Sequence, residues 1–202
     1  MSTTTVESGW DRRRKLRLSE YEQIALGLFA ARGYRSVTFD EIADVAGVSG
    51  RTLFRYFPNK EAFLLSFPRA GVALAVEMIA ALPLSDTPLE AAWEAMRDSY
   101  LAEPADVAQL SLWRRAAAGA PEVVARVRGE RFQALMDALT AYCARSLGAD
   151  PVTDARPRLL AGILAGAEMA AVETWGRSDL TLAEILGAAE LTFRNRTILG
   201  SA

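Results

Sequence analysis

Residues 38–60 read TFDEIADVAGVSGRTLFRYFPNK, and this stretch predicts two short helices joined by a tight turn. Thr38 and Glu41 have the spacing of a capping box, in which the Thr hydroxyl and the Glu carboxylate accept hydrogen bonds from free N–H groups at a helix start. The first helix is therefore expected over residues 39–46. Gly47 should end it, because glycine takes the positive φ of a helix C-terminus without a Cβ penalty.

The second helix of the pair is expected over residues 50–56. Ser49 is a good N-cap for it, and Pro58 should end it. Two short helices separated by a turn that contains glycine are typical of a helix-turn-helix. The second helix would leave polar and small residues facing outward, a face that suits phosphates and base edges. The candidate DNA-binding residues here are Ser49, Gly50, Arg51, Thr52, Arg55 and Tyr56, with Thr38 at the start of the preceding helix.

These residues resemble the N-terminal signature of the tetracycline-repressor (TetR) family of bacterial regulators. The matching segments are Ala31-Arg32-Gly33-Tyr34, residues 38–49, Leu53-Phe54-Arg55-Tyr56-Phe57 and Pro58-Asn59-Lys60-Glu61. The resemblance is specific over about residues 20–65. It implies an all-α protein with a DNA-binding head, a helical ligand-binding body and a homodimer interface. It also implies that Lys60 contacts a DNA phosphate; the alternative is an exposed lysine at the start of a helix.

The N-terminal residues are predicted to form a flexible basic arm over residues 1–18, which carries five positive charges within residues 12–17. Charge runs are usually solvated tails. Beside a helix-turn-helix, however, such a run favours contacts with DNA phosphates or the minor groove. Arg12, Arg13 and Arg14 are therefore candidate DNA contacts. Ser19 and Glu22 should open the first helix of a DNA-binding domain over residues 19–65.

Charge is distributed unevenly along the 202 residues. The whole chain has a formal net charge of −2, which by itself does not favour nucleic acid as a partner. Residues 1–60 contain ten Lys and Arg against seven Asp and Glu, whereas residues 61–202 contain 13 against 18. The basic excess therefore coincides with the helix-turn-helix, as an electrostatic footprint on DNA requires.

Composition argues against several other classes of protein. The absence of histidine removes the usual general base, the commonest zinc ligand and Ser-His or Cys-His nucleophiles, so we expect neither catalytic residues, a metal nor a cofactor. Cys143, the one cysteine, suits a small buried role better than a redox sensor. No signal-like N-terminus and no run of about 18 apolar residues is evident, which predicts a soluble, cytoplasmic protein without a membrane partner.

The remaining sequence, residues 66–202, predicts a helical body without strand alternation, which brings the expected total to about nine helices. A helix from residue 59 to 81 should link head and body, and Pro68 should kink or split it. Further helices are expected over residues 87–102, 104–118, 121–147, 155–175 and 181–198.

The last two helices are candidates for a dimer interface. Gly162, Gly166 and Ala170 form a stripe of small residues on one helix, and apolar residues recur along the other. Such stripes suit intramolecular packing equally well, because an obligate interface resembles a core cut in half. The resemblance favours the interface, because in the TetR family these helices form a four-helix dimer contact.

A ligand pocket is expected among the middle helices, again because family members generally hold an effector there. Aromatic and Met residues at helical spacing are more often plain core residues. Glu168 needs a partner if it is buried, and three possibilities remain open: a ligand, an arginine across the dimer, or solvent. The candidate ligand-binding residues are Trp93, Met96, Tyr100, Trp113, Phe132, Met136, Glu168 and Met169, with Trp175, Arg114, Arg115 and Glu173 as further members.

The sequence thus predicts a ligand-responsive, homodimeric transcriptional repressor that leaves a palindromic operator when a small molecule binds. The alternatives are a transcriptional activator, a DNA architectural protein without an operator preference and, least favoured, a helical enzyme.

Overall fold

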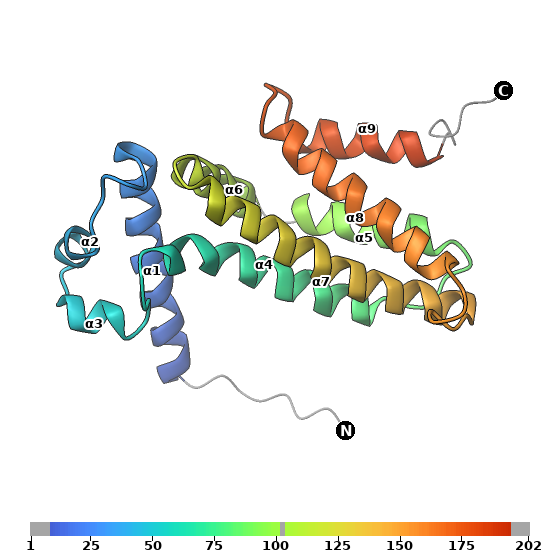
Figure 1. Ribbon diagram of the computed structural model, residues 1–202, viewed down its shortest axis with the longest axis horizontal. Coiled ribbons are helices and arrows are strands. Elements are labelled where there is room, and N and C mark those ends of the chain that lie inside the picture. The colour runs from blue at the N-terminus through green and yellow to red at the C-terminus, as the bar shows by residue number, and fades with distance from the viewer. Residues whose placement is uncertain (1–8, 102–103, 195–202) are drawn as a thin grey trace. The chain divides into compact units, whose positions relative to one another are not determined.

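The computed structural model describes residues 9–101 and 104–194, and over these residues the protein has nine helices and no strand (Figure 1). This confirms the all-α prediction and its helix number. The helices are α1 (Gly9–Arg32), α2 (Phe39–Val45), α3 (Gly50–Phe54), α4 (Glu61–Ala81), α5 (Pro88–Leu101), α6 (Pro104–Ala117), α7 (Pro121–Leu147), α8 (Arg156–Trp175) and α9 (Leu182–Arg194). The predicted continuation of the last helix to residue 198 lies outside the described residues.

The chain divides into two compact units. One contains the chain up to Phe67 together with residues 110–124, and the other contains residues 68–109 and the chain from residue 125 onward. The sequence predicts a division between residues 65 and 66, and the first boundary between the two units lies after Phe67. The prediction nevertheless assigned residues 110–124 to the body, whereas they pack with the helix-turn-helix. Gly119 illustrates this, because a Cβ at that position would lie 3.5 Å from the backbone nitrogen of Tyr34.

Pro68 lies inside α4, where the sequence predicts a kink or a break. Proline has no N–H, so the Leu64 carbonyl one turn earlier loses its usual partner within the helix. The indole N–H of Trp113 in α6 donates to this carbonyl at 2.7 Å, and Trp113 is itself buried. A side chain from another helix thus satisfies the group that proline leaves unpaired, and α4 continues as one helix to Ala81.

The first unit has an aromatic core beneath α2 and α3. Phe57 and Phe63 stack with ring centroids 4.1 Å apart, and Phe29 of α1 meets Phe63 edge to face. Ile42 of α2 and Leu53 of α3 are fully buried. Each short helix thus has one large side chain that is fully buried in this core, and Phe39 of α2 also contacts the Phe63 ring. The exposed face of α3 remains available for other contacts.

The first helix begins ten residues earlier than predicted. α1 starts at Gly9, so the described part of the expected flexible arm is helical, and Ser19 and Glu22 lie inside the helix. The basic residues Arg12, Arg13 and Arg14 are exposed on this extension. The preceding residues of the expected arm, residues 1–8, lie outside the described part of the chain.

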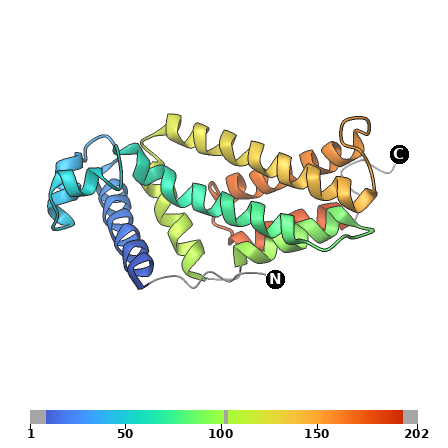
Figure 2. The same cartoon turned by 90° about the horizontal axis from the view of Figure 1, so that it is seen from below.

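The second unit places α5 against α8 and α9, and α8 against α9 (Figure 2). A Thr181–Glu184 capping box opens α9: the Glu184 N–H donates to the Thr181 hydroxyl at 3.2 Å, and the Thr181 N–H donates to the Glu184 carboxylate at 2.7 Å. Cys143 is fully buried on α7. In the described residues of this unit, buried Leu, Ala and aromatic side chains form the core.

One helix contradicts the expectation that no segment is apolar enough to span a membrane. By length and composition alone, α4 could cross one. This is weak evidence for a membrane protein, since helices of soluble proteins often meet the same criteria. The sequence interpretation overlooked it because two small apolar runs flank Pro68, and only their continuity in one helix gives the required length.

Candidate nucleic-acid interface and ligand-binding region

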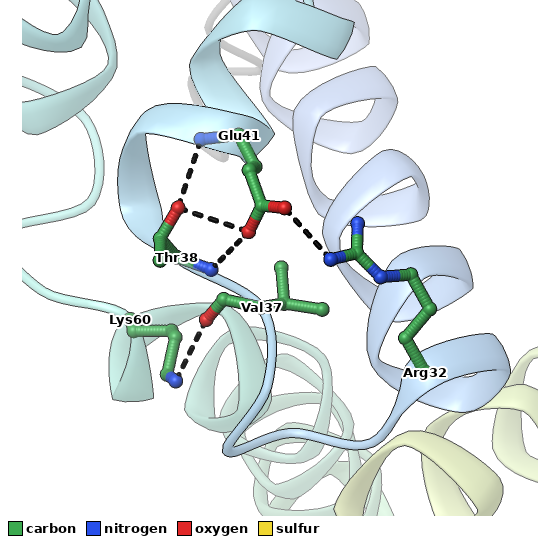
Figure 3. A network of polar contacts seen from close by, with 5 residues as sticks. All are labelled: Arg32, Val37, Thr38, Glu41 and Lys60. Atoms are coloured by element: carbon green, nitrogen blue, oxygen red, sulfur yellow. Dashed lines mark hydrogen bonds and ion pairs between the residues drawn. The ribbon is translucent and has the colours of Figure 1, made fainter.

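The start of α2 is fixed by the predicted capping box (Figure 3). The Thr38 N–H donates to one Glu41 carboxylate oxygen at 2.7 Å, and the Glu41 N–H donates to the Thr38 hydroxyl at 3.2 Å. Arg32 at the end of α1 donates to the other Glu41 oxygen at 2.7 Å. These bonds, the Thr38 backbone bond foremost, lower the pKa of Glu41 to about 2. Their contribution to stability is therefore complete above the usual glutamate pKa and is lost progressively as the pH falls from there through about 2.

The second helix of the pair, α3, is capped as predicted but ends at Phe54, two residues before its expected end. The Ser49 hydroxyl accepts from the Thr52 N–H at 3.1 Å and also pairs with the Thr52 hydroxyl at 2.9 Å. Both hydroxyls thus take part in the cap. Arg51 is exposed in the first turn of the helix, and Thr52 is half-buried.

Arg55 and Tyr56 form a pair directly after α3. The Arg55 guanidinium donates to the Tyr56 hydroxyl at 3.0 Å and lies 4.9 Å from the centroid of its ring. Tyr56 also contacts the ring of Tyr21 on α1, with centroids 6.1 Å apart. The guanidinium is therefore held on an aromatic surface but stays exposed.

Two features of α3 were not evident from the sequence. Phe54 is 60% exposed although it belongs to the motif that resembles the TetR family. Its ring contacts that of Phe39, with ring centroids 6.2 Å apart. Gly50 lies close to Asp40, because a Cβ at Gly50 would come within 3.3 Å of an Asp40 carboxylate oxygen. A side chain at position 50 would therefore require the Asp40 carboxylate to shift slightly, whereas the predicted role of Gly50 in the approach of DNA stays a prediction.

Lys60 has an internal role that the sequence interpretation did not consider. Its ammonium donates to the Tyr34 carbonyl at 2.7 Å and to the Val37 carbonyl at 2.9 Å, the second of which is drawn in Figure 3. It also lies 4.4 Å from the centroid of the Tyr34 ring. Partial burial lowers the pKa of Lys60. Two of its three N–H groups therefore hold the turn between α1 and α2, and neither alternative drawn from the sequence included this role.

Glu168 lies in the body, where the structure contradicts the expected solvent exposure and shows an arginine partner within the same chain. It is neither exposed nor dependent on a second subunit, because Arg131 of α7 donates to one of its oxygens through Nε at 2.9 Å and Nη2 at 2.6 Å. Tyr100 of α5 donates to the same oxygen. The Glu168 side chain is 4% exposed and that of Arg131 is 23% exposed. Burial and the charge of Glu168 raise the pKa of Tyr100, so its hydroxyl stays a donor.

The other predicted ligand-binding residues are spread over the body. Trp93 and Met96 are buried on α5, the helix that carries Tyr100, and Met136 is half-buried. Phe132 and Met169 are partly exposed, at 36% and 37%. Trp113 belongs to the first unit, apart from the rest of the set.

The further candidates for ligand binding differ in their environments. Glu173 pairs with Arg128 of α7 at 2.5 Å. Trp175 is buried on α8, Arg114 is half-buried and Arg115 is exposed, both on α6. Of the predicted set, the structure thus brings together Tyr100 and Glu168, which bond to each other directly and share Arg131 as a donor.

The capped two-helix unit with arginines on its exposed face, followed by a separate helical body, defines the class of helix-turn-helix transcriptional regulators. Comparison with known proteins gives the family. The family model described as "Bacterial regulatory proteins, tetR family" matches residues 24–67, and the family model described as "MftR C-terminal domain" matches residues 86–193. The chain belongs to the TetR family of transcriptional regulators. Members of this family are regulators, which confirms the expectation that the chain is not an enzyme.

Individual relatives agree with this assignment. The chain is 29% identical over 188 residues to MftR of Mycobacterium tuberculosis, a proposed mycofactocin biosynthesis transcriptional regulator, with 91% of this chain and 92% of MftR covered. It is 36% identical over 88 residues to the regulator TcmR of Streptomyces glaucescens, covering 43% and 39% of the two chains. The structure of Salmonella enterica GusR has the same fold, with a TM-score of 0.62 and 19% identity, and the match covers 89% of this chain and 92% of the GusR chain.

Proposed function

We propose that the chain is a homodimeric, cytoplasmic repressor that binds a palindromic operator and releases it when a small molecule binds to the body. The observation that carries the DNA-binding part is the capped helix α3, which has Arg51 exposed in its first turn and Arg55 exposed after its last. A helix of this kind in the major groove can direct arginines to the O6 and N7 atoms of guanine. Tyr56, Thr38, Ser49 and Thr52 border this surface and suit phosphate contacts through hydroxyl or backbone groups.

A homodimer is supported by an apolar stripe on α8. Leu159 is 64% exposed and Ile163, one turn later, is 45% exposed, and the small residues Gly162, Gly166 and Ala170 continue beside them. Small residues allow the close approach of a partner helix, and exposed aliphatic residues gain when they are buried. A two-fold dimer would also present two α3 helices to successive half-sites of a palindrome.

Replacement of Ile163 by aspartate should test this interface, because it would place a charge in the proposed contact. We expect the dimer to dissociate and operator affinity to fall at least tenfold, as measured by sedimentation velocity and by fluorescence anisotropy. Leu84→Asp is the matched control, since Leu84 is 66% exposed outside α8 and α9 and should leave both readings unchanged. A dimeric Ile163→Asp variant with full affinity would exclude this surface.

An effector in the body is supported by the match of residues 86–193 to the MftR C-terminal domain. The buried Glu168 and the half-buried Tyr100 and Arg131 would supply the polar end of a site whose apolar part includes Trp93, Met96 and Met136. A bound effector would favour a body conformation that changes the spacing of the two heads, which would lower operator affinity.

Selection of bound DNA from a random pool is the experiment that tests the proposal. A palindrome would support a two-fold reader, whereas the absence of any sequence preference would indicate an architectural protein. Reporter transcription from the selected site would separate repressor from activator. A thermal-shift screen of amphipathic compounds would identify effectors, and turnover of any compound that binds would revive an enzymatic function.

Lys60 provides a separate test of how the head is built. In Lys60→Met, the Tyr34 and Val37 carbonyls lose a charged donor, and we expect the free energy of unfolding to fall by about 1–3 kcal/mol. DNA binding should weaken alike on all sequences, with the salt dependence unchanged. If Lys60 instead contacts a phosphate, stability should stay constant while the slope of log affinity against log salt falls by about 0.9 for each bound subunit.

A further inference from the structure

The N-terminal part of α1, residues 9–18, is a dense cluster of positive charge that the proposed recognition helix does not account for. This basic segment contains Arg12, Arg13, Arg14, Lys15 and Arg17, all of them exposed. It is helical and continuous with the 24-residue helix that packs into the first unit. Its side chains therefore have fixed directions relative to that unit, which a flexible arm would not give them.

The direction in which each side chain of the basic segment points follows from the helical repeat of 3.6 residues per turn. Arg17, Arg14 and Trp10 precede Tyr21 by 4, 7 and 11 residues, so the four share one stripe of α1. The Arg14 guanidinium lies 5.8 Å from the Trp10 ring centroid, consistent with that stripe. Lys15 precedes Tyr21 by six residues and faces away from it.

Tyr21 connects this stripe to the proposed DNA-reading surface. Its ring contacts that of Tyr56, whose hydroxyl and ring in turn hold the Arg55 guanidinium. Figure 1 shows the N-terminal end of α1 (dark blue) extending beyond the level of α3 (cyan). At 1.5 Å per residue, Arg14 lies about 10 Å along the helix from Tyr21 and Arg17 about 6 Å from it.

We propose that Arg14 and Arg17 form a rigid basic strip that binds the DNA backbone just outside the base pairs contacted by α3. The inference rests on the proposed DNA-binding function and extends its footprint. Double-stranded DNA is the partner that fits, because guanidinium groups on one helix face match a row of phosphates and bind them bidentately. A helix already formed in the free protein spends little conformational entropy on this contact.

The first experiment uses the DNA obtained by random-pool selection, made in two lengths: the selected palindrome alone, and the same palindrome with 10 added base pairs on each side. Failure to select any DNA would refute the proposed function before the strip is tested. For Arg14→Ala/Arg17→Ala, we expect the salt slope on the long DNA to fall by about 1.8 for each bound subunit. Between 50 and 200 mM salt, the wild-type protein should therefore lose roughly tenfold more affinity per subunit than the variant.

The matched pair for this test is Arg17→Ala and Lys15→Ala, which remove the same charge from opposite faces of α1. Arg17→Ala should lower the salt slope on the long DNA by about 0.9 for each subunit, and Lys15→Ala should leave it unchanged. On the short DNA, both variants should bind like the wild-type protein. An equal fall in salt slope for the two variants, or an equal fall on the two DNA lengths, would overturn the assignment of the DNA contact to one face of α1.

A second pair of variants distinguishes a rigid basic strip from a flexible basic arm. Leu16 is 60% exposed, and Leu16→Pro keeps every positive charge while interrupting the helix between Arg12 and Leu16. We expect Leu16→Pro to lose about as much affinity for the long DNA as Arg14→Ala, because Arg17 follows the break and keeps its place in the helix, whereas Leu16→Ala should bind normally. Thermal melting should be the same for both Leu16 variants. Full affinity of Leu16→Pro would refute the strip.

Discussion

Arg131→Met is expected to lower the free energy of unfolding of the protein by about 3–5 kcal/mol, because it leaves the buried Glu168 carboxylate without its cation. Arg131 makes two hydrogen bonds to one Glu168 oxygen, and Glu168 is 3% exposed. Tyr100 alone would remain as a donor, and a neutral phenol compensates a buried charge only in part. Urea unfolding followed by circular dichroism measures the change.

Arg128→Met is the matched control for this prediction. Arg128 is also on α7 and also pairs with a glutamate of α8, Glu173, but its side chain is 48% exposed. Loss of an exposed pair should cost less than about 1 kcal/mol. The double variant Arg131→Met/Glu168→Leu should recover most of the lost stability, since removing both charges leaves none unpaired. If Arg131→Met and Arg128→Met were equally stable, the buried pair would contribute no more than a surface pair.

The helix-turn-helix could be predicted from sequence because its signals are local. Thr38 with Glu41, Gly47 and Ser49 each determine a helix end within four residues, and the structure has those ends. Gly47, for example, has a φ of +67°. The partner of Glu168 could not be predicted in this way, because Arg131 is 37 residues away and its neighbours Arg126 and Arg128 have the same charge. Only packing selects among them.

Two further differences between the sequence prediction and the structure have the same origin, because both depend on more than local sequence signals. The capping box of Ser19 and Glu22 predicts a helix start at Ser19, but nothing in that local signal excludes an earlier start at Gly9. Both roles that the sequence suggests for Lys60, a DNA phosphate contact and an exposed lysine, lie outside the protein core. Its ammonium instead binds backbone carbonyls that lie 26 and 23 residues earlier. A long flexible side chain can reach backbone groups that no short-range pattern reveals, so interior roles of lysine and arginine are the least predictable part of the site.

The double variant Arg51→Ala/Arg55→Ala is expected to abolish recognition of the selected operator while sparing weak binding to random DNA. Each bidentate arginine–guanine contact contributes about 1–3 kcal/mol of discrimination, so the loss of two should lower operator affinity by roughly 100-fold or more. Arg55 should contribute through its position on the Tyr56 ring, which limits its rotamers before DNA binds. Fluorescence anisotropy with operator and random duplexes of equal length, at one salt concentration, measures both affinities.

Arg35→Ala is the control for loss of charge, since Arg35 is exposed in the turn between α1 and α2 and takes no part in the proposed surface. It should lower both affinities slightly and keep their ratio. The single variants then apportion the effect: Arg51→Ala should relax preference at base pairs near the N-terminus of α3, and Arg55→Ala at those near its C-terminus, which repeated selection would resolve. Equal losses on operator and random DNA would mean that both arginines bind phosphates, and α3 would then position the head without reading the sequence.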